Sequence, residues 1–239
     1  MIVAGLALLF ASGAHAAPSD QYDACLSRAQ SDPAGALAQA SAWSKKGGGV
    51  AADHCAALAL VGLQRYSEAA ERLDALARNP IAAEPSRKTA LYDQAGNAWL
   101  LAGRADSAIA SFTEALGIDP FDADLLTDRA RALALKQNWA KAESDLSAAL
   151  LVSPDRADLY VLRGSARHAQ GHTADARADF DRALRLQPRN GDALLERGTM
   201  KFEAGDRAGA RADWQSAAAA APGTPVAETA QQRLAQTPP

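Results

Sequence analysis

The stretch ADLYVLRGSARHAQGHTADARADFDRALRLQPRN, residues 157–190, decides the fold. Its apolar and small residues recur at intervals of three and four, the period of a helix, on both sides of Gly171. Pro188, near its end, stops the second periodic run, because proline lacks an N–H and clashes with the preceding helical turn. The stretch therefore predicts two helices joined by a turn that contains Gly171.

The same pattern recurs along the chain. Prolines stand at Pro120, Pro154, Pro188 and Pro222, each 34 residues after the last. Columns of alanine, of bulky residues and of small residues keep the same step: Ala108, Ala142, Ala176 and Ala210; Ala115, Ala149, Ala183 and Ala217; Phe112, Leu146, Phe180 and Trp214; Gly96, Ala130, Gly164 and Gly198. One helical hairpin cannot bury its apolar face alone, so this repetition predicts stacked hairpins that share a continuous core.

These columns resemble the tetratricopeptide repeat (TPR), which has a small residue at position 8, alanine at 20 and 27, a bulky residue at 24 and proline at 32. Four regular repeats match, over 89–122, 123–156, 157–190 and 191–224. The departures are local: position 4 carries tyrosine or leucine in place of tryptophan, and position 15 is Gln137 in one repeat. The resemblance implies an all-α fold, a right-handed superhelical α-solenoid of TPR helical hairpins.

Less regular segments flank the four repeats. Residues 20–80 are interpreted as irregular TPR-like helical hairpins, with a break at Asp32-Pro33 and a glycine-rich stop at 47–49. Within them, Tyr66, Ala69 and Leu73 have the spacing of positions 17, 20 and 24. A turn-rich joint at 79–88 separates the two parts. Residues 225–236 begin with proline, are polar on one face, and are expected to form a C-terminal capping helix.

An arginine occupies position 7 in three repeats, and an aspartate follows it sixteen residues later. The pairs are Arg129 with Asp145, Arg163 with Asp179, and Arg197 with Asp213. The first regular repeat lacks both members and has Ala95 and Ser111 instead. An unpaired arginine at a half-buried position is costly. We therefore expect structural ion pairs that bridge the two helices of each hairpin; the alternative is a ladder of charged ligand contacts.

The first residues resemble an export signal. Residues 1–16 have an apolar core from Ile2 to Phe10, and Ala14-His15-Ala16 fits the small-x-small rule for cleavage before Ala17. No lysine or arginine precedes Arg28, so the terminal amine is the only positive charge ahead of the core. The alternatives are a buried helix and a membrane anchor, although the apolar run is only about half the roughly 20 residues that a membrane span needs. A signal peptide predicts a periplasmic or secreted protein.

Cys25 and Cys55 are the only cysteines. Each is predicted on the first helix of a successive hairpin, and first helices of neighbouring TPR-like units pack side by side. In an exported protein this arrangement predicts a disulfide that joins the irregular hairpins; two buried free thiols are the alternative. No C-x-x-C motif is present, which argues against a redox enzyme.

The sequence contains no recognisable catalytic or cofactor motif. Walker, G-x-G-x-x-G, G-x-S-x-G and H-E-x-x-H patterns are absent. His168 and His172 have metal-like spacing, but Gly171 lies between them and no third ligand is evident. The recurring Asp124, Asp158 and Asp192 are expected to favour the positive ends of helices. We therefore expect no enzyme, no cofactor and no metal, and the net charge of −3 argues against nucleic acid.

The resemblance implies a concave face, lined by positions 2, 5, 9 and 12 of the first helices, that binds peptides or partner helices. The candidate groove residues are Asn97, Arg131, Ser165, His168, Thr199 and Phe202, with Asp93, Thr127, Val161 and Leu195 beside them. Some TPR proteins hold a C-terminal carboxylate with lysine, asparagine and arginine. Here only Asn97 matches and Asp93 replaces the lysine, so this mode is rejected.

The expected function is a non-enzymatic periplasmic scaffold of a Gram-negative bacterium that binds a protein or peptide. Envelope assembly, secretion and cell-wall machinery are all compatible with it. The alternatives are a self-associating structural module and, with less support, an enzyme with an unrecognised site.

Overall fold

The computed structural model describes residues 18–80 and 84–237, and these residues form helices and connecting turns without strands. The all-α repeat architecture expected from the sequence is thereby confirmed. The expected signal peptide, residues 1–16, lies outside the described residues. No helix in the described part of the chain is long and apolar enough to cross a membrane. The chain divides into two compact units, Met1–Ala69 and Ala70–Pro239, which are described separately.

The first unit contains α1 (Pro18–Ser31), α2 (Pro33–Ser44) and α3 (Gly49–Gly62). Asp32 separates α1 from α2, and its carboxylate accepts a hydrogen bond from the Gly35 N–H, which caps α2. Pro33 occupies the first turn, where its missing N–H has no cost. α1 packs against both α2 and α3, and their shared core consists mainly of alanines and the two cysteines. α4 (Tyr66–Arg78) begins in this unit and ends in the next.

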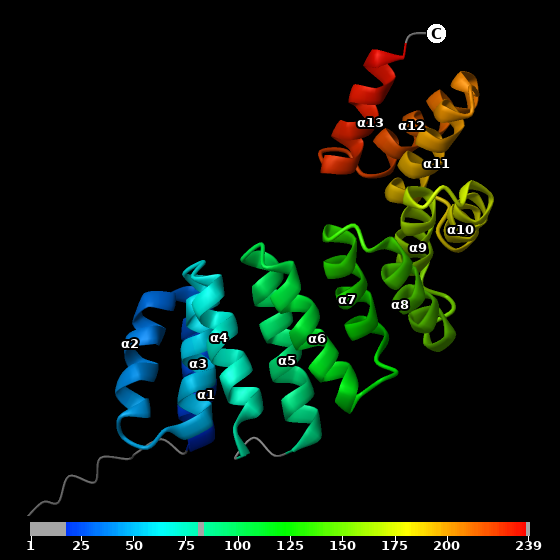
Figure 1. Cartoon of the computed structure of the whole chain (residues 1–239). Coiled ribbons are helices and arrows are strands. Elements are labelled where there is room, and N and C mark those ends of the chain that lie inside the picture. The colour runs from blue at the N-terminus through cyan, green and yellow to red at the C-terminus, as the bar shows by residue number, and fades with distance from the viewer. Residues whose placement is uncertain (1–17, 81–83, 238–239) are drawn as a thin grey trace, which may run out of the picture. The chain divides into compact units, whose positions relative to one another are not determined.

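The second unit is a row of helical hairpins (Figure 1). The hairpins are α5 (Pro85–Leu101) with α6 (Ala105–Ile118), α7 (Ala123–Leu135) with α8 (Trp139–Val152), α9 (Ala157–Ala169) with α10 (Thr173–Leu186), and α11 (Gly191–Glu203) with α12 (Arg207–Ala220). α5 begins at Pro85, ahead of the expected repeat start at 89, because proline is suited to the first helical turn. α13 (Pro225–Gln236) packs against α12 and α11.

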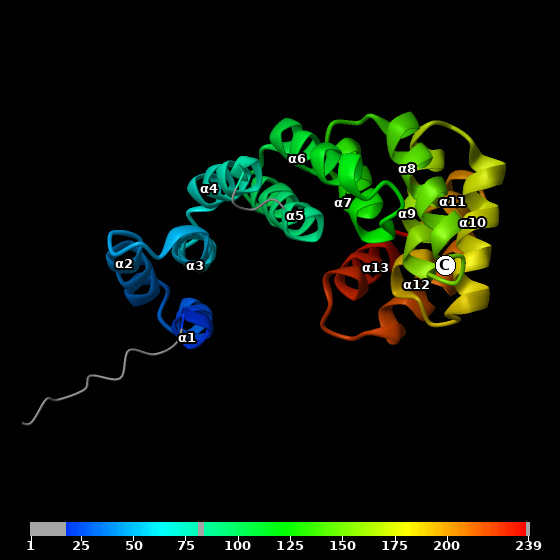
Figure 2. The same ribbon diagram turned by 90° about the horizontal axis from the view of Figure 1, so that it is seen from below.

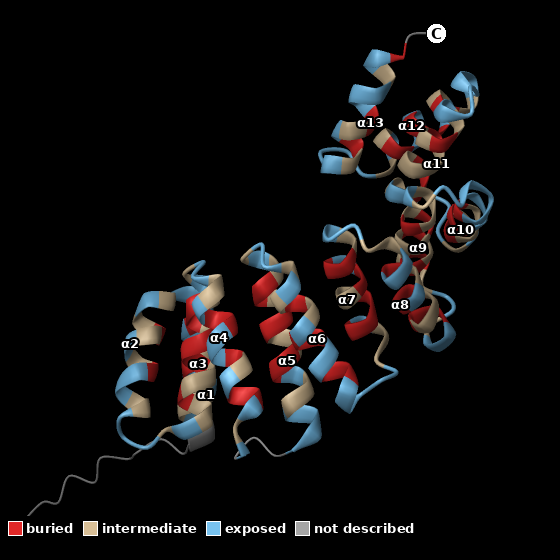
Figure 3. Ribbon diagram, viewed as in Figure 1, coloured by how far each residue is buried: buried red, intermediate tan, exposed pale blue. Residues whose placement is uncertain are grey.

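Close contact between an aromatic residue and a glycine joins the two helices in three of the four hairpins. A Cβ added to Gly96 would lie 2.5 Å from Phe112, one on Gly164 would lie 2.7 Å from Phe180, and one on Gly198 would lie 2.6 Å from Trp214. The three aromatic side chains are essentially fully buried. The buried faces are the ones that helices turn towards each other (Figure 3). The column of small residues at position 8 is therefore a steric requirement of close helix packing.

The turn inside each hairpin needs a left-handed residue. Gly103, Gly171 and Gly205 have φ values of 70°, 80° and 86°, and Gln137, which replaces glycine in one repeat, has φ 57°. Successive first helices contact each other, α5 with α7 and α9 with α11. Within this unit, α6, α8 and α10 lie on the outer side of a curve, and α5, α7 and α9 lie on the inner side (Figure 2). The first helices therefore line the inner face.

Candidate binding groove

The structure brings the members of each expected Arg–Asp pair together. Arg163 donates through Nε and Nη2 to the two carboxylate oxygens of Asp179, at 2.9 and 2.7 Å. The Arg129–Asp145 and Arg197–Asp213 pairs have the same two-pronged geometry, at 2.8 to 2.9 Å. The Asp179 side chain is only 5% exposed. Two parallel charge-assisted hydrogen bonds thus tie the first helix of each hairpin to the second.

The same arginines also reach the preceding repeat. The remaining nitrogen, Nη1, donates to Thr113 from Arg129 and to Ser147 from Arg163, both at 3.3 Å, and to Asp181 from Arg197 at 2.8 Å. All three acceptors occupy position 25 of the previous repeat. This link was not predicted from the sequence, although the column of polar residues at position 25 was a visible signal for it. Each arginine therefore couples two neighbouring repeats as well as two helices.

The first regular repeat makes a related contact without arginine. Ser111 donates its hydroxyl to Asp74 of α4 at 2.9 Å, and the Trp99 indole N–H donates to the same carboxylate at 2.9 Å. Asp74 has the spacing of position 25 of the degenerate repeat that contains Tyr66. Here the carboxylate belongs to the preceding repeat and is only half-buried, and neutral donors take the place of the guanidinium.

Asp213 is stabilised as an anion by the cations beside it. Burial would raise the pKa of Asp213, but hydrogen bonds from Arg197 and Lys201 outweigh burial and hold this pKa below its ordinary value. All three guanidinium nitrogens of Arg163 are already occupied by protein acceptors. These arginines are therefore not free to contact a ligand, and the geometry is that of a structural network.

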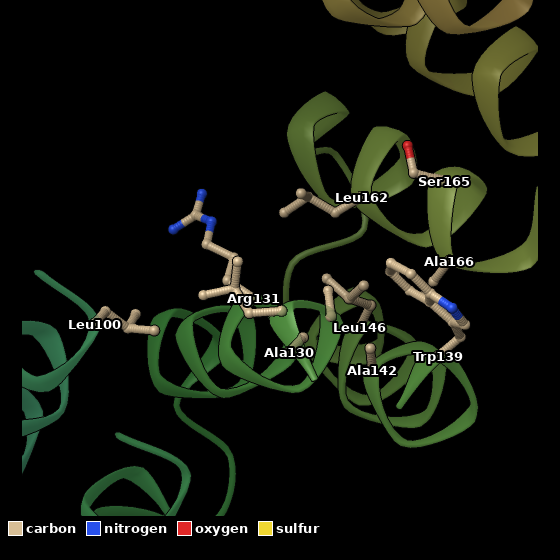
Figure 4. A pocket seen from close by; sticks show the side chains of 11 residues that line it. Leu100, Ala130, Arg131, Trp139, Ala142, Leu146, Leu162, Ser165 and Ala166 are labelled. Carbon is tan, nitrogen blue, oxygen red and sulfur yellow. The ribbon is translucent and has the colours of Figure 1, made fainter. Parts of the chain in front are cut away.

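An apolar cavity of about 340 Å³ opens among α5, α7, α8 and α9 (Figure 4). Its lining is largely apolar, with Arg131 and Ser165 as the polar members: Leu100, Ala130, Arg131, Ala134, Leu135, Trp139, Ala142, Leu146, Leu162, Ser165 and Ala166. In Figure 4, Leu100 lies on one side of the cavity, and Trp139 and Leu162 lie on the other. Leu135 is 66% exposed, although it is a large apolar side chain.

A second cavity of about 390 Å³ lies at the N-terminal ends of α5 and α7, and its lining is acidic. Its residues are Ser86, Thr89, Ala90, Asp93, Asp119, Asp122, Asp124, Leu125 and Asp128. We call it the acidic pocket. Burial, together with the charges of Asp128, Asp122 and Asp124, raises the pKa of Asp93 to about 6. Asn97 donates to Asp93 at 2.9 Å and to Asp128 at 3.4 Å, and so bridges the two carboxylates.

The sequence-predicted groove residues have different surroundings. Arg131 and Ser165 line the apolar cavity, and Asn97 lies between carboxylates at the acidic pocket. His168 on α9 contacts Glu203 through Nε2 at 2.8 Å. Phe202 is 38% exposed, and its ring lies 5.6 Å from that of Trp214. The Thr199 hydroxyl donates to the Leu195 carbonyl within its own helix.

Two of the neighbouring expectations are wrong. Thr127 is 1% exposed and Val161 is also buried, so neither can contact a ligand in the groove. Position 5 faces the packing between helices in these two repeats, and the Thr127 hydroxyl donates to the carbonyl of Ala123 one turn earlier. Leu100, Leu135 and Trp139 were not predicted from the sequence as lining residues. Leu100 at position 12 was a detectable signal, but the convergence of all three depends on the packing of four helices.

The two cysteines lie at the centre of the first unit. Cys25 on α1 and Cys55 on α3 are fully buried and joined as a disulfide, with Cα atoms 6.1 Å apart. This separation is within the ordinary range for a disulfide. The described residues contain no cluster of three histidine, cysteine or carboxylate side chains that could hold a metal. His172 stands before α10, and its Nδ1 lies 3.9 Å from Glu143, whereas His168 faces Glu203.

A family model described as tetratricopeptide repeat matches residues 56–123 and 169–225, which together make up more than half of the chain. The chain belongs to the tetratricopeptide repeat family. No curated protein matches it significantly.

Several solved structures are similar to it. A fragment of MamA from Desulfovibrio magneticus RS-1, from residue 41 to its end, is 17% identical, covers 84% of this chain and 95% of its own, and has a TM-score of 0.58. The first TPR of Spaghetti (RPAP3), bound to the HSP90 peptide SRMEEVD, is 31% identical over 50% of this chain and 95% of its own, with a TM-score of 0.48. The second TPR domain of human RPAP3, in complex with an HSP70 peptide, is 29% identical over 49% of this chain and 98% of its own, with a TM-score of 0.48. The MamA likeness supports the fold alone.

Proposed function

We propose that this TPR protein is an exported, non-enzymatic scaffold that binds an extended segment of a partner protein in the groove along α5, α7 and α9. The observation that carries the proposal is the apolar cavity with the exposed Leu135 at its edge. A large apolar side chain left in water is compatible with a site that another molecule covers. In this family the face lined by first helices binds peptides or partner helices, and here that face holds the cavity.

The chemistry of the groove supports binding and gives no support to catalysis. Among its polar groups, Arg131 and Asn97 are held by Asp128 and Asp93, and the Ser165 hydroxyl donates to the Val161 carbonyl of its own helix. Neither Arg131 nor Asn97 adjoins a nucleophile with a base to activate it, as covalent catalysis needs. The export signal of the sequence and the Cys25–Cys55 pair support a periplasmic location, where disulfides persist. Envelope assembly, secretion and cell-wall machinery remain the candidate processes.

The test is partner capture from the periplasm of a Gram-negative host that expresses the full chain. A Leu100→Ser/Leu135→Ser variant should lose the cross-linked partner that the unchanged protein captures, because both side chains line the cavity. Leu151→Ser is the matched control, since Leu151 is 87% exposed and lies outside the cavity. Equal capture by both variants would contradict the proposal. Retention of the chain in the cytoplasm would contradict export, and light scattering that showed only self-association would favour a structural module.

A further inference from the structure

We propose that the groove selects a basic partner segment: an extended peptide with a lysine or arginine that enters the acidic pocket and, about three residues away, a bulky apolar side chain that fills the apolar cavity. This inference rests on the proposed function and adds the chemistry of the partner.

Both cavities share the same face of α7. Asp124 and Asp128 line the acidic pocket, and Arg131 and Leu135 line the apolar cavity. Their spacing of four, three and four residues places them along one side of the helix. α5 repeats the order: Asp93 lines the acidic pocket and Leu100 lines the apolar cavity. The inner face therefore changes from acidic to apolar along the direction of these two helices.

The distance between the two cavities sets the spacing of the peptide. Asp128 and Leu135 are seven residues apart on α7, and so are Asp93 and Leu100 on α5. At about 1.5 Å of rise per residue, seven residues of helix span roughly 10 Å. A peptide in the polyproline II conformation rises about 3.1 Å per residue with three residues per turn, so side chains three positions apart lie on the same side of the peptide, about 9 Å from each other. The cation and the apolar side chain should therefore be three positions apart.

Charge complementarity identifies the occupant of the acidic pocket as a cation. Arg131 pairs with Asp128, and Arg156 pairs with Asp124, at 2.7 and 2.5 Å. No ion pair to Asp93, Asp119 or Asp122 is found among the described residues, and Asp122 serves as the cap of α7. The carboxylates therefore outnumber the cations in the pocket. In the free protein, the neighbouring carboxylates repel the negative charge of Asp93. A lysine or arginine side chain would offset this repulsion, whereas an acidic segment would add to it.

A metal ion does not explain the pair of cavities equally well. Among the described residues no group of carboxylates is arranged to hold a metal, and the largely apolar lining of the adjoining cavity would not ligate one. A peptide with both a cationic and an apolar side chain satisfies both halves of the groove.

The probe is a fluorescein-labelled ten-residue peptide of glycine and serine that contains one lysine and, three positions later, one phenylalanine. Its companions carry glutamate in place of lysine, serine in place of phenylalanine, or the two residues side by side; a fifth has the reversed order. Fluorescence anisotropy with the full chain should show that one of the two orders binds at least tenfold more tightly than the glutamate peptide at pH 7.5. Equal binding of the lysine and glutamate peptides would overturn the inference and leave groove binding intact.

Variants separate the two halves of the groove. Asp93→Asn should weaken the lysine peptide at least threefold, and Asp192→Asn, which removes a carboxylate from the first turn of α11 outside the pocket, should not. Leu135→Ser should weaken the phenylalanine peptide and leave the serine peptide unchanged. If Asp93→Asn and Asp192→Asn have the same effect, the pocket does not select charge. If no peptide binds, the inference fails, while partner capture and its loss in the Leu100→Ser/Leu135→Ser variant decide the proposed function separately.

The pH dependence gives a second readout. Affinity for the lysine peptide should rise between about pH 5 and pH 7.5, because Asp93 has a pKa of about 6 in the free protein and must ionise to attract the cation. The other carboxylates of the pocket are Asp119, Asp122, Asp124 and Asp128, of which the last two are paired with arginines. Asp93→Asn should flatten the profile, and an unchanged slope would count against the role of the pocket.

Discussion

The two units hold their helices together in different ways. In the first unit the core of α1, α2 and α3 is made mainly of alanines, with leucines at its margin and a buried disulfide at its centre. In the second unit Phe112, Phe180 and Trp214 fill the space left by small residues. Burial of a methylene group contributes about 0.8 kcal/mol, and a whole large apolar side chain about 1.5–3 kcal/mol. We therefore expect the first unit to depend mainly on the Cys25–Cys55 link, and the second on repeated side-chain packing.

The second unit also has a polar network of Arg–Asp pairs. Position 7 arginines link the two helices of their own hairpin and also the preceding repeat. In the first regular repeat, hydrogen bonds from Ser111 and Trp99 to Asp74 link the hairpin to the preceding repeat. The location of the polar contact is thus maintained while its chemistry changes, which indicates that the repeat needs a directional link at this point of the interface.

Removal of the disulfide should have the largest effect, and it should be confined to the first unit. The bond closes a loop of 30 residues, for which the chain-entropy model gives about 3–4 kcal/mol. Cys25→Ser/Cys55→Ser, or a reductant, should speed hydrogen exchange in α1–α3 and leave α7–α12 protected, because repeat arrays can lose terminal units separately. Uniform loss of protection along the chain would show that the units unfold together. Two free thiols in periplasmic material would contradict the oxidised state.

Substitutions of the position 7 arginines should give the next largest effects, and the loss of stability should differ from one arginine to the next. Asp145 is paired with Arg129 alone in the described structure, whereas Asp179 keeps Arg167, and Asp213 keeps Lys201. Loss of one partner of a buried pair leaves an uncompensated charge. Arg129→Ala should therefore lower the free energy of unfolding by about 2–3 kcal/mol, and Arg163→Ala or Arg197→Ala by about 1–2 kcal/mol. Urea unfolding checks the order.

Arg177→Ala is the matched control for this series, because Arg177 is 70% exposed and lies 4.0 Å from Asp181; its loss should cost less than about 1 kcal/mol. A double-mutant cycle of Arg163→Ala with Asp179→Ala should show a coupling energy, and additive effects would mean that the contact is not formed in solution. Equal losses for Arg129→Ala and Arg163→Ala would mean that Arg167 does not compensate Asp179.

The sequence was sufficient for the parts of the fold that recur. The 34-residue period predicted the hairpins, and the joint presence or absence of arginine and aspartate predicted their contact, because the repeats act as internal copies of one packing problem. The groove was less predictable. Thr127 and Asp93 share position 5, yet one is buried and the other faces the acidic pocket. Which side chains line a cavity depends on small rotations of neighbouring helices, which a period of 34 residues does not encode.

The smallest expected effect has the opposite sign. Substitutions in the packing should destabilise the fold, whereas neutralising the groove residue Asp93 should stabilise it. The pKa of Asp93 is raised to about 6 in the folded protein, so the folded state binds a proton that the unfolded chain releases near pH 4. The Asp93 carboxyl therefore contributes to the free energy of unfolding at low pH, and this contribution is lost as the pH rises through about 6. The full shift would correspond to roughly 3 kcal/mol, but Asp93 is only partly buried and solvent screens it, so we expect about 1 kcal/mol. Asp93→Asn should raise the free energy of unfolding by that amount at pH 8, and the gain should shrink as the pH falls towards 4. Urea unfolding at both pH values, with Asp192→Asn as the control, measures this gain. If Asp93→Asn lowers the free energy of unfolding at pH 8, the Asp93 carboxylate stabilises the fold and the prediction is wrong.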